Sequence, residues 1–133
     1  MRFLETDAIL RYLTADDFEK AGSVLALLES VERGSERVAV SPMVIFEVVF
    51  TLQSYYKAPR EDIRAKVSTI VDLRGLSVDN SDVFVEALDL YCEAGLPFAD
   101  AFNACYMKSR ELNEIYTYDE DYDRVKGIKR VAP

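Results

Sequence analysis

The chain has 133 residues, of which 50% are hydrophobic and 30% are charged, and this composition suits one compact domain over residues 1–133. Acidic residues outnumber basic ones by 24 to 16, so the net charge is -8, which excludes a nucleic-acid binder that covers phosphates with a broad basic surface. Because there is no histidine, histidine-based catalysis and the common zinc sites are also excluded. We therefore expect any catalytic chemistry to depend on carboxylates.

Two further features limit the class of protein. Cys92 and Cys105 are the only cysteines, and without a C-x-x-C spacing they predict two buried, reduced thiols. No apolar run approaches the roughly 20 residues of a membrane span, and the first residues do not have the pattern of a signal peptide. We therefore expect a cytoplasmic protein that does not enter a membrane.

Hydrophobic periodicity and turn residues predict short strands that alternate with helices. In chain order, the expected strands are residues 2–5, 38–40, 76–78, 114–118 and 127–131. The expected helices are residues 8–13, 14–33, 43–56, 59–73, 80–94 and 99–112. Thr14 is expected to lead a capping box, and Ser41 is expected to cap the helix that Pro42 begins.

Strands separated by helices in this way are typical of a parallel sheet with helices on both faces. No linker, repeat or low-complexity segment interrupts the pattern. We therefore predict an α/β fold, a single three-layer α/β/α domain with a central parallel sheet. Ligands of such sheets bind outside the carboxyl ends of the strands.

Acidic residues occur where this site is expected. Glu5 is predicted to end the first strand, and Asp7, two residues later, is predicted to cap the next helix. Asp119 directly follows the strand 114–118. Asp100 lies in the first turn of its helix, where an anion is favoured. Glu47 interrupts a helix that is apolar on nearly every side, so it is expected to be buried and to need a functional explanation.

Taken singly, Glu5, Asp7 and Asp100 are ordinary helix-capping or first-turn acids, and Asp121 and Asp123 are expected to be solvated loop charges. Together, four or five converging carboxylates repel one another unless a cation lies among them. Oxygen ligands without histidine or cysteine suit Mg²⁺ or Mn²⁺, and one or two such ions can support phosphodiester hydrolysis. The pattern therefore predicts a metal-dependent nuclease.

Four segments carry the candidate acids in chain order: residues 3–13, 41–49, 96–102 and 116–123. In that order they resemble the motifs of the PIN-domain ribonucleases, and among these the VapC-type toxins of toxin–antitoxin pairs. The resemblance covers nearly the whole chain. It implies a PIN-like domain and an Mg²⁺- or Mn²⁺-dependent endoribonuclease, the toxin of a type II toxin–antitoxin system. The catalytic residues that it implies are Glu5, Glu47, Asp100 and Asp119, with Asp7 as a further metal ligand.

One motif departs from the family pattern. The family's opening motif normally contains Asp-Thr-Asn, whereas this chain has Glu5-Thr6-Asp7. Either Glu5 takes the place of the first aspartate, which we favour, or Asp7 takes over its ligand role. The resemblance also implies an RNA substrate, a homodimer, and a cognate antitoxin that covers the acidic site. The resemblance also implies an apolar groove for these partners, and aromatic residues in excess of what one small core needs support it, for example Phe18, Tyr55, Tyr56 and Phe84.

Two other functions fit parts of the pattern. A PIN-like module with weakened catalysis that binds a protein partner is favoured by the altered first motif. The absence of lysine and arginine from residues 75–107 also favours it, because that face should repel RNA. A phosphoacceptor receiver domain could use Asp79, but it needs a lysine after a later strand, where this chain has acids. The ribonuclease is therefore the preferred prediction, and the interaction module is the alternative.

Overall fold

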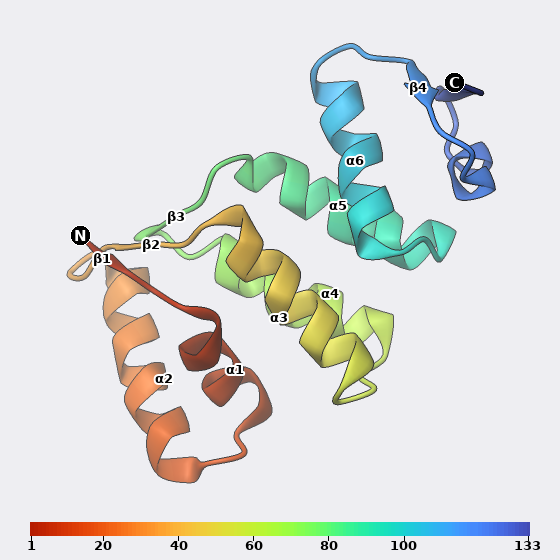
Figure 1. Ribbon diagram of the computed structural model, residues 1–133. Helices are drawn as coiled ribbons and strands as arrows, with labels where there is room; N and C mark the ends of the chain where they lie inside the picture. Colours follow the sequence, from red (N-terminus) through yellow and green to blue (C-terminus); the bar gives the residue numbers. More distant parts are fainter. The chain divides into compact units, whose positions relative to one another are not determined.

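The computed structural model describes residues 1–133, and every predicted strand and helix is present in it (Figure 1). The strands are β1 (Arg2–Phe3), β2 (Val38–Ala39), β3 (Leu76–Ser77), β4 (Glu114–Tyr116) and β5 (Lys129–Val131). The helices are α1 (Thr6–Thr14), α2 (Phe18–Arg33), α3 (Pro42–Ser54), α4 (Arg60–Val71), α5 (Ser81–Ala94) and α6 (Phe98–Ser109). A 3-10 helix, η1 (Glu120–Arg124), was not predicted.

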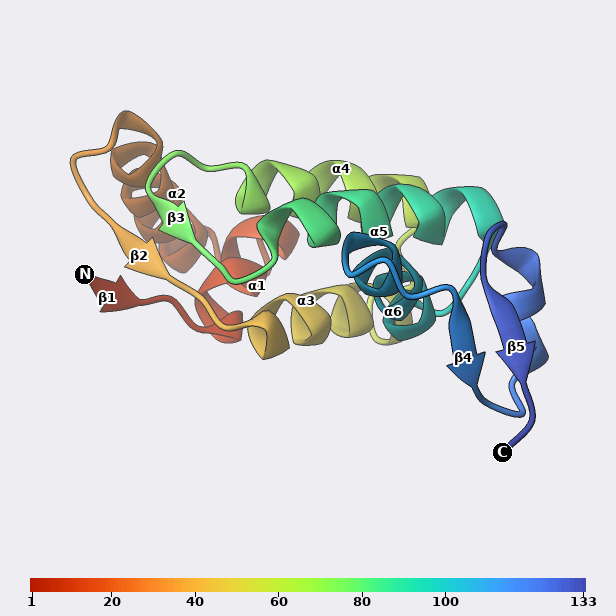
Figure 2. The same cartoon turned by 90° about the horizontal axis from the view of Figure 1, so that it is seen from above.

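The chain forms two compact units, Met1–Ser81 and Asp82–Pro133, which are described separately. In the first unit, β1, β2 and β3 form a parallel sheet in that order, with Val38 opposite both Arg2 and Leu76. In the second, β4 and β5 lie side by side and are also parallel (Figure 2). The predicted α/β class with parallel strand pairing is confirmed. The strands form a three-stranded and a two-stranded sheet, and α5 and α6 separate the two in the chain.

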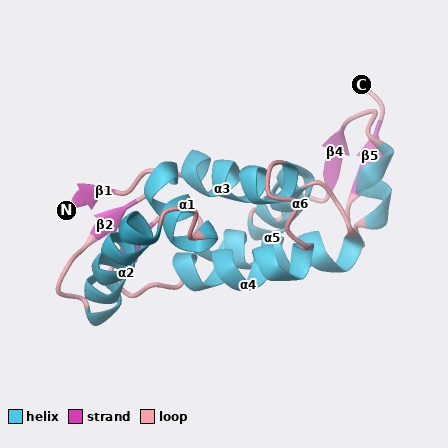
Figure 3. Ribbon diagram, turned by 90° about the horizontal axis from the view of Figure 1, so that it is seen from below, coloured by secondary structure: helices cyan, strands magenta, loops and turns pink.

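Helices make up most of the first unit, and its strands are short (Figure 3). The helix α1 packs against α2 and α3, and α3 packs against α4. Aliphatic side chains at helical spacing fill the space between these helices, because their burial stabilises the fold. Among the most deeply buried are Ile9, Val31, Ile45, Val48, Val49, Leu52, Ile63 and Val67.

Aromatic rings form much of the core of the second unit. The rings of Phe84 and Phe102 have centroids 4.7 Å apart, and Tyr91 meets Phe98 edge-on at 5.7 Å. These contacts join α5 to α6, while η1 packs against α6 and β5. Phe84 is fully buried in this core, so it is not one of the surplus aromatic residues that could serve the expected apolar groove.

Two predicted helix caps are wrong in position. The strand β1 ends at Phe3, and Glu5 is the N-cap of α1, where its carboxylate accepts a hydrogen bond from the Asp7 amide at 2.8 Å. Thr14 belongs to the end of α1 because its hydroxyl donates to the Leu10 carbonyl within that helix. Asp17 caps α2 instead. In both places a carboxylate satisfies a free amide of the first helical turn.

The helix α3 is more exposed than its composition predicts. Ser41 caps it as expected, but one stripe along it remains open to solvent. Met43 is 64% exposed and Phe50 is 70% exposed, and Glu47 lies between them on the same face. The prediction that Glu47 is buried is therefore wrong, because the apolar pattern does not reveal which apolar side chains face outward.

Other sequence-based expectations are met in part. Both cysteines are free thiols; Cys105 is buried, whereas Cys92 is partly exposed. None of the helices combines the length and the apolar character that a membrane-spanning segment needs.

The glycine before β3 offers a stability test. A methyl group on Gly75 would lie 2.6 Å from the carbonyl oxygens of Val31 and Glu36, both backbone atoms that cannot easily move away. We expect Gly75→Ala to lower the free energy of unfolding by about 2 kcal/mol. The matched control is Gly22→Ala, at an exposed position in α2 with no atom within 4 Å, which should raise it by about 0.5–1 kcal/mol. Urea unfolding measures both variants, and equal effects would contradict the described packing.

Candidate metal centre

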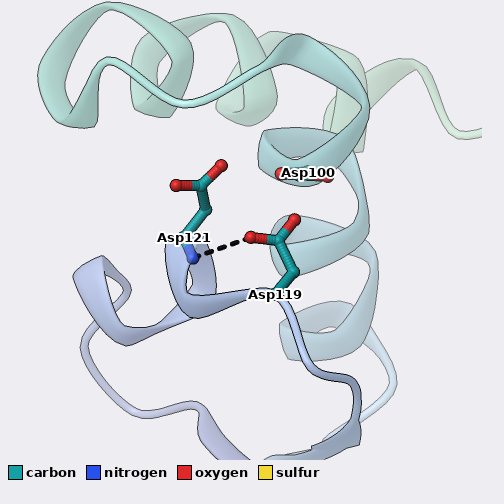
Figure 4. Close-up of side chains that lie close together, drawn as sticks. All are labelled: Asp100, Asp119 and Asp121. Atoms are coloured by element: carbon teal, nitrogen blue, oxygen red, sulfur yellow. Dashed lines mark hydrogen bonds between the residues drawn. The ribbon is translucent and has the colours of Figure 1, made fainter.

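Three carboxylates come together in the second unit. One oxygen each from Asp100, Asp119 and Asp121 lies within 4.8 Å of the others (Figure 4). Asp100 comes from the first turn of α6, and the other two come from the beginning of η1. We call these three residues the acidic cluster.

Local backbone structure holds the two η1 acids. Asp119 is the N-cap of η1, and its carboxylate accepts a hydrogen bond from the Asp121 amide at 2.9 Å, the dashed line in Figure 4. The Asp119 amide donates to the Thr117 hydroxyl at 3.0 Å. Asp121 forms an ion pair with Arg124, one turn later, at 3.3 Å. The backbone of η1 therefore places both carboxylates on the side of Asp100.

Asp100 has a side-chain partner. The hydroxyl of Tyr122 donates a hydrogen bond to its Oδ1 at 3.4 Å, and the same hydroxyl accepts one from the Asn103 side-chain amide at 3.1 Å. Tyr122 is only 5% exposed although it lies in the otherwise charged η1. The three polar groups thus link α6 to η1 beside the acidic cluster.

Electrostatics disfavour an ionised Asp100 in the absence of a cation. Burial raises the pKa of its carboxyl group above the ordinary value, and the charges of Asp119 and Asp121 raise it further. The hydrogen bond from Tyr122 opposes this shift. Since a divalent cation would remove the repulsion, and since all available ligand atoms are hard oxygens, the cluster fits an ion such as Mg²⁺ or Mn²⁺.

The remaining predicted acids belong to the first unit. Glu5 is exposed and caps α1, while Asp7 is exposed in the first turn of that helix and pairs with Arg11 at 3.4 Å. Glu47 is exposed on α3. Of the five acids predicted from sequence, the structure brings together Asp100 and Asp119.

Asp121 is the cluster residue that the sequence prediction missed. It was expected to be a solvated loop charge, but it is only partly exposed and is the second residue of η1. The available signal was the Asp119-x-Asp121 spacing, which places two carboxylates close together when the first of them caps a helix. Asp123, by contrast, is exposed as predicted and pairs with Arg130 at 3.1 Å.

Comparison with known proteins identifies the family. The PIN domain family model matches residues 2–128, so the chain belongs to the PIN-domain family, as the four motifs predicted. A protein named VapC ribonuclease from Aquifex aeolicus is 28% identical over 133 residues, which covers 100% of this chain and 97% of that protein. Among solved structures, VapC20 of Mycobacterium tuberculosis, described as a sarcin-ricin loop cleaving toxin, is similar with 17% identity and a TM-score of 0.41 over 100% of both chains.

The repulsion at Asp100 predicts a pH-dependent gain in stability. With metal removed by a chelator, Asp100→Asn should melt at a higher temperature than the wild type at pH 7, because a carboxyl group with a raised pKa is ionised there at a cost. The gain should shrink as the pH falls toward 3.8, the ordinary value, because the wild-type side chain then becomes protonated. Asp79→Asn, which removes an exposed charge outside the cluster, is the control and should show no such gain. The explanation would be contradicted if the stability difference between Asp100→Asn and the wild type favoured the variant less at pH 7 than at pH 4.

Proposed function

We propose that this chain is a metal-dependent endoribonuclease that hydrolyses phosphodiester bonds of RNA and serves as the toxin of a type II toxin–antitoxin system. The observation that carries the proposal is the convergence of Asp100, Asp119 and Asp121 in a chain that belongs to the PIN-domain family. The full-length similarity to a protein named VapC ribonuclease supports the substrate and the role. Such a toxin would act in the cytoplasm, where its RNA substrate is found.

The proposed cofactor is Mg²⁺ or Mn²⁺. The acidic cluster offers oxygen ligands alone, and the repulsion that raises the pKa of Asp100 would be relieved by a divalent cation. When bound, such an ion polarises the scissile phosphodiester and offsets the negative charge that develops during its hydrolysis. The carboxylates of Asp100, Asp119 and Asp121 would hold the ion.

We extend the proposed site to the acids of the first unit. Glu5 and Glu47 would join Asp100 and Asp119 as catalytic ligands, and Asp7 would be a further ligand. The order of these acids in the four motifs supports this assignment. It assumes that residues 1–133 act as a single PIN-like domain, and the span of the family model over residues 2–128, which covers both units, supports that assumption.

The capping geometry supports Glu5 over Asp7 as the first ligand. The Asp7 amide fixes one oxygen of the Glu5 carboxylate and leaves the other available, while Asp7 itself pairs with Arg11. The longer side chain of Glu5 thus combines helix capping with a free oxygen for a ligand.

The alternative function is a PIN-like module that binds a protein partner without efficient catalysis. One face of α5 favours it, because Asp82, Glu86 and Glu93 are exposed there and would repel RNA. Basic groups in the first unit favour the ribonuclease instead, because Arg11 and Lys20 line a hollow of about 360 Å³ beside Asp7 and could contact phosphates of RNA. A cleavage assay distinguishes the two functions directly.

The proposed partners are a second copy of this chain and an antitoxin. Exposed aromatic side chains support a protein-binding surface in the first unit: Phe18 is 89% exposed, Tyr55 is 76% exposed and Phe50 is 70% exposed. Light scattering at micromolar concentration should give the mass of a dimer, and a monomer would count against this part of the proposal.

Metal binding can be assigned to the acidic cluster by charge removal. Asp119→Asn and Asp121→Asn should each weaken Mn²⁺ binding by at least tenfold in titration calorimetry, because each removes a ligand charge. Glu47→Gln is expected to weaken it as well. The control is Asp123→Asn, in the same short helix but paired with Arg130, which should leave Mn²⁺ binding unchanged. Equal binding by Asp121→Asn and Asp123→Asn would remove Asp121 from the site.

The altered first motif makes a sharp kinetic prediction. Glu5→Gln should reduce single-turnover RNA cleavage by a factor of about 10² or more, because it removes a ligand charge while the amide oxygen can still cap α1. Asp7→Asn restores the usual family residue and should leave cleavage largely intact, since the exposed Asp7–Arg11 pair contributes little to stability. If the order is reversed, Asp7 is the ligand. If the wild type is inert toward every RNA with either ion, the interaction module replaces the nuclease.

A further inference from the structure

Tyr122 is chemically unlike its neighbours in the segment that carries two of the acids. The helix η1 has the sequence Glu-Asp-Tyr-Asp-Arg, and Tyr122 is its one buried residue. Its ring packs inside the second unit, so the direction of its hydroxyl is set by the position of the ring. The proposed metal chemistry does not itself require this hydroxyl.

The hydroxyl has two partners on one face of α6. Asn103 and Asp100 are three residues apart, about one helical turn, so both reach the same oxygen of Tyr122. The Asn103 amide donates to that oxygen at 3.1 Å, and the hydroxyl in turn donates to Oδ1 of Asp100 at 3.4 Å. A phenol has a single proton to donate, and with Asn103 acting as donor that proton is directed to the carboxylate.

The carboxylate of Asp100 needs such a constraint. Its two like-charged neighbours, Asp119 and Asp121, repel it, and a side-chain rotation could increase its distance from them. A hydrogen bond to one oxygen fixes the orientation of the carboxylate and so directs the lone pairs of its other oxygen. Hydrogen-bond donors to metal-binding carboxylates generally have this effect. Asp119 and Asp121 are already fixed by the backbone and by Arg124, so Asp100 is the acid whose orientation depends on a remote side chain.

We infer that Tyr122, itself oriented by Asn103, is a positioning residue that holds the Asp100 carboxylate in the orientation needed to bind the divalent cation. The inference rests on the proposed function of the acidic cluster. It assigns to Tyr122 and Asn103 a role in metal affinity that is separate from the packing of the Tyr122 ring.

The decisive variant is Tyr122→Phe, which keeps the ring and removes only the hydroxyl. We expect its dissociation constant for Mn²⁺, measured with the metal alone by electron paramagnetic resonance of the free ion, to rise about tenfold. Its melting temperature in chelator should stay within a few degrees of the wild type, because the ring still fills its place. Tyr116→Phe, at a 78% exposed position of β4, is the matched control and should bind Mn²⁺ like the wild type.

Asn103 tests whether the effect passes through the hydroxyl. Asn103→Ala, at an exposed position, removes the donor that directs the Tyr122 proton, so it should weaken Mn²⁺ binding by a smaller factor than Tyr122→Phe. The double variant should bind Mn²⁺ no more weakly than Tyr122→Phe alone, because Asn103 affects the metal site only through the Tyr122 hydroxyl. A residue with a merely structural role would give additive losses instead. Asn103→Ala also keeps the test valid if Tyr122→Phe folds poorly.

Each outcome separates this inference from the proposed function. If the wild type binds Mn²⁺, Asp100→Asn does not, and Tyr122→Phe binds as tightly as the wild type, the positioning role is overturned while the metal site remains. If the losses in Tyr122→Phe and Asn103→Ala add, the relay through the hydroxyl is overturned. If the wild type does not bind Mn²⁺, the proposed metal site fails and the inference fails with it.

Discussion

Repulsion among the carboxylates of Asp100, Asp119 and Asp121 is the constraint on which the candidate site depends. Three ligand oxygens within 4.8 Å of one another are unfavourable unless other groups hold them there or a cation joins them. The fold supplies one restraint for each acid: the Tyr122 hydroxyl for Asp100, a backbone amide of η1 for Asp119, and Arg124 for Asp121. All three restraints come from a segment of six residues, 119–124, which is anchored through the buried Tyr122.

Most of the candidate acids share a second feature, a position at the N-terminus of a helix. Glu5 and Asp119 are N-caps, and Asp7, Asp100 and Asp121 lie in first helical turns. Free amides and the helix dipole stabilise negative charge at these positions, so they offset part of the repulsion before any ion binds. An acid can therefore be a structural cap and a candidate ligand at the same time, which explains why neither role excludes the other at Glu5. Glu47, in the middle of α3, is the exception, and its exposed place between Met43 and Phe50 leaves it open to a ligand or a partner.

Sequence alone predicted what depends on periodicity and on strand ends. The helices and strands were found because apolar spacing reflects burial, and Asp100 and Asp119 were both selected as site residues because of their places at a helix start and a strand end. Asp121 was missed because η1 is a single short 3-10 helix with no apolar period to reveal it. The exposure of Glu47 was missed because an apolar stripe does not show which side faces solvent. The link from Asn103 through Tyr122 to Asp100 joins residues up to 22 positions apart, and no local pattern predicts it.

The most direct test of the account is to locate the ion. Crystals of the protein grown with Mn²⁺ would be measured at a wavelength where manganese scatters anomalously. A manganese peak is expected in contact with carboxylate oxygens of Asp100, Asp119 and Asp121, with the Tyr122 hydroxyl still hydrogen-bonded to Asp100. If Glu5 and Glu47 are also ligands, as proposed, they contact the same ion or pair of ions. A well-ordered acidic cluster without a peak at saturating Mn²⁺, or a peak only at acids outside it, would contradict the central claim.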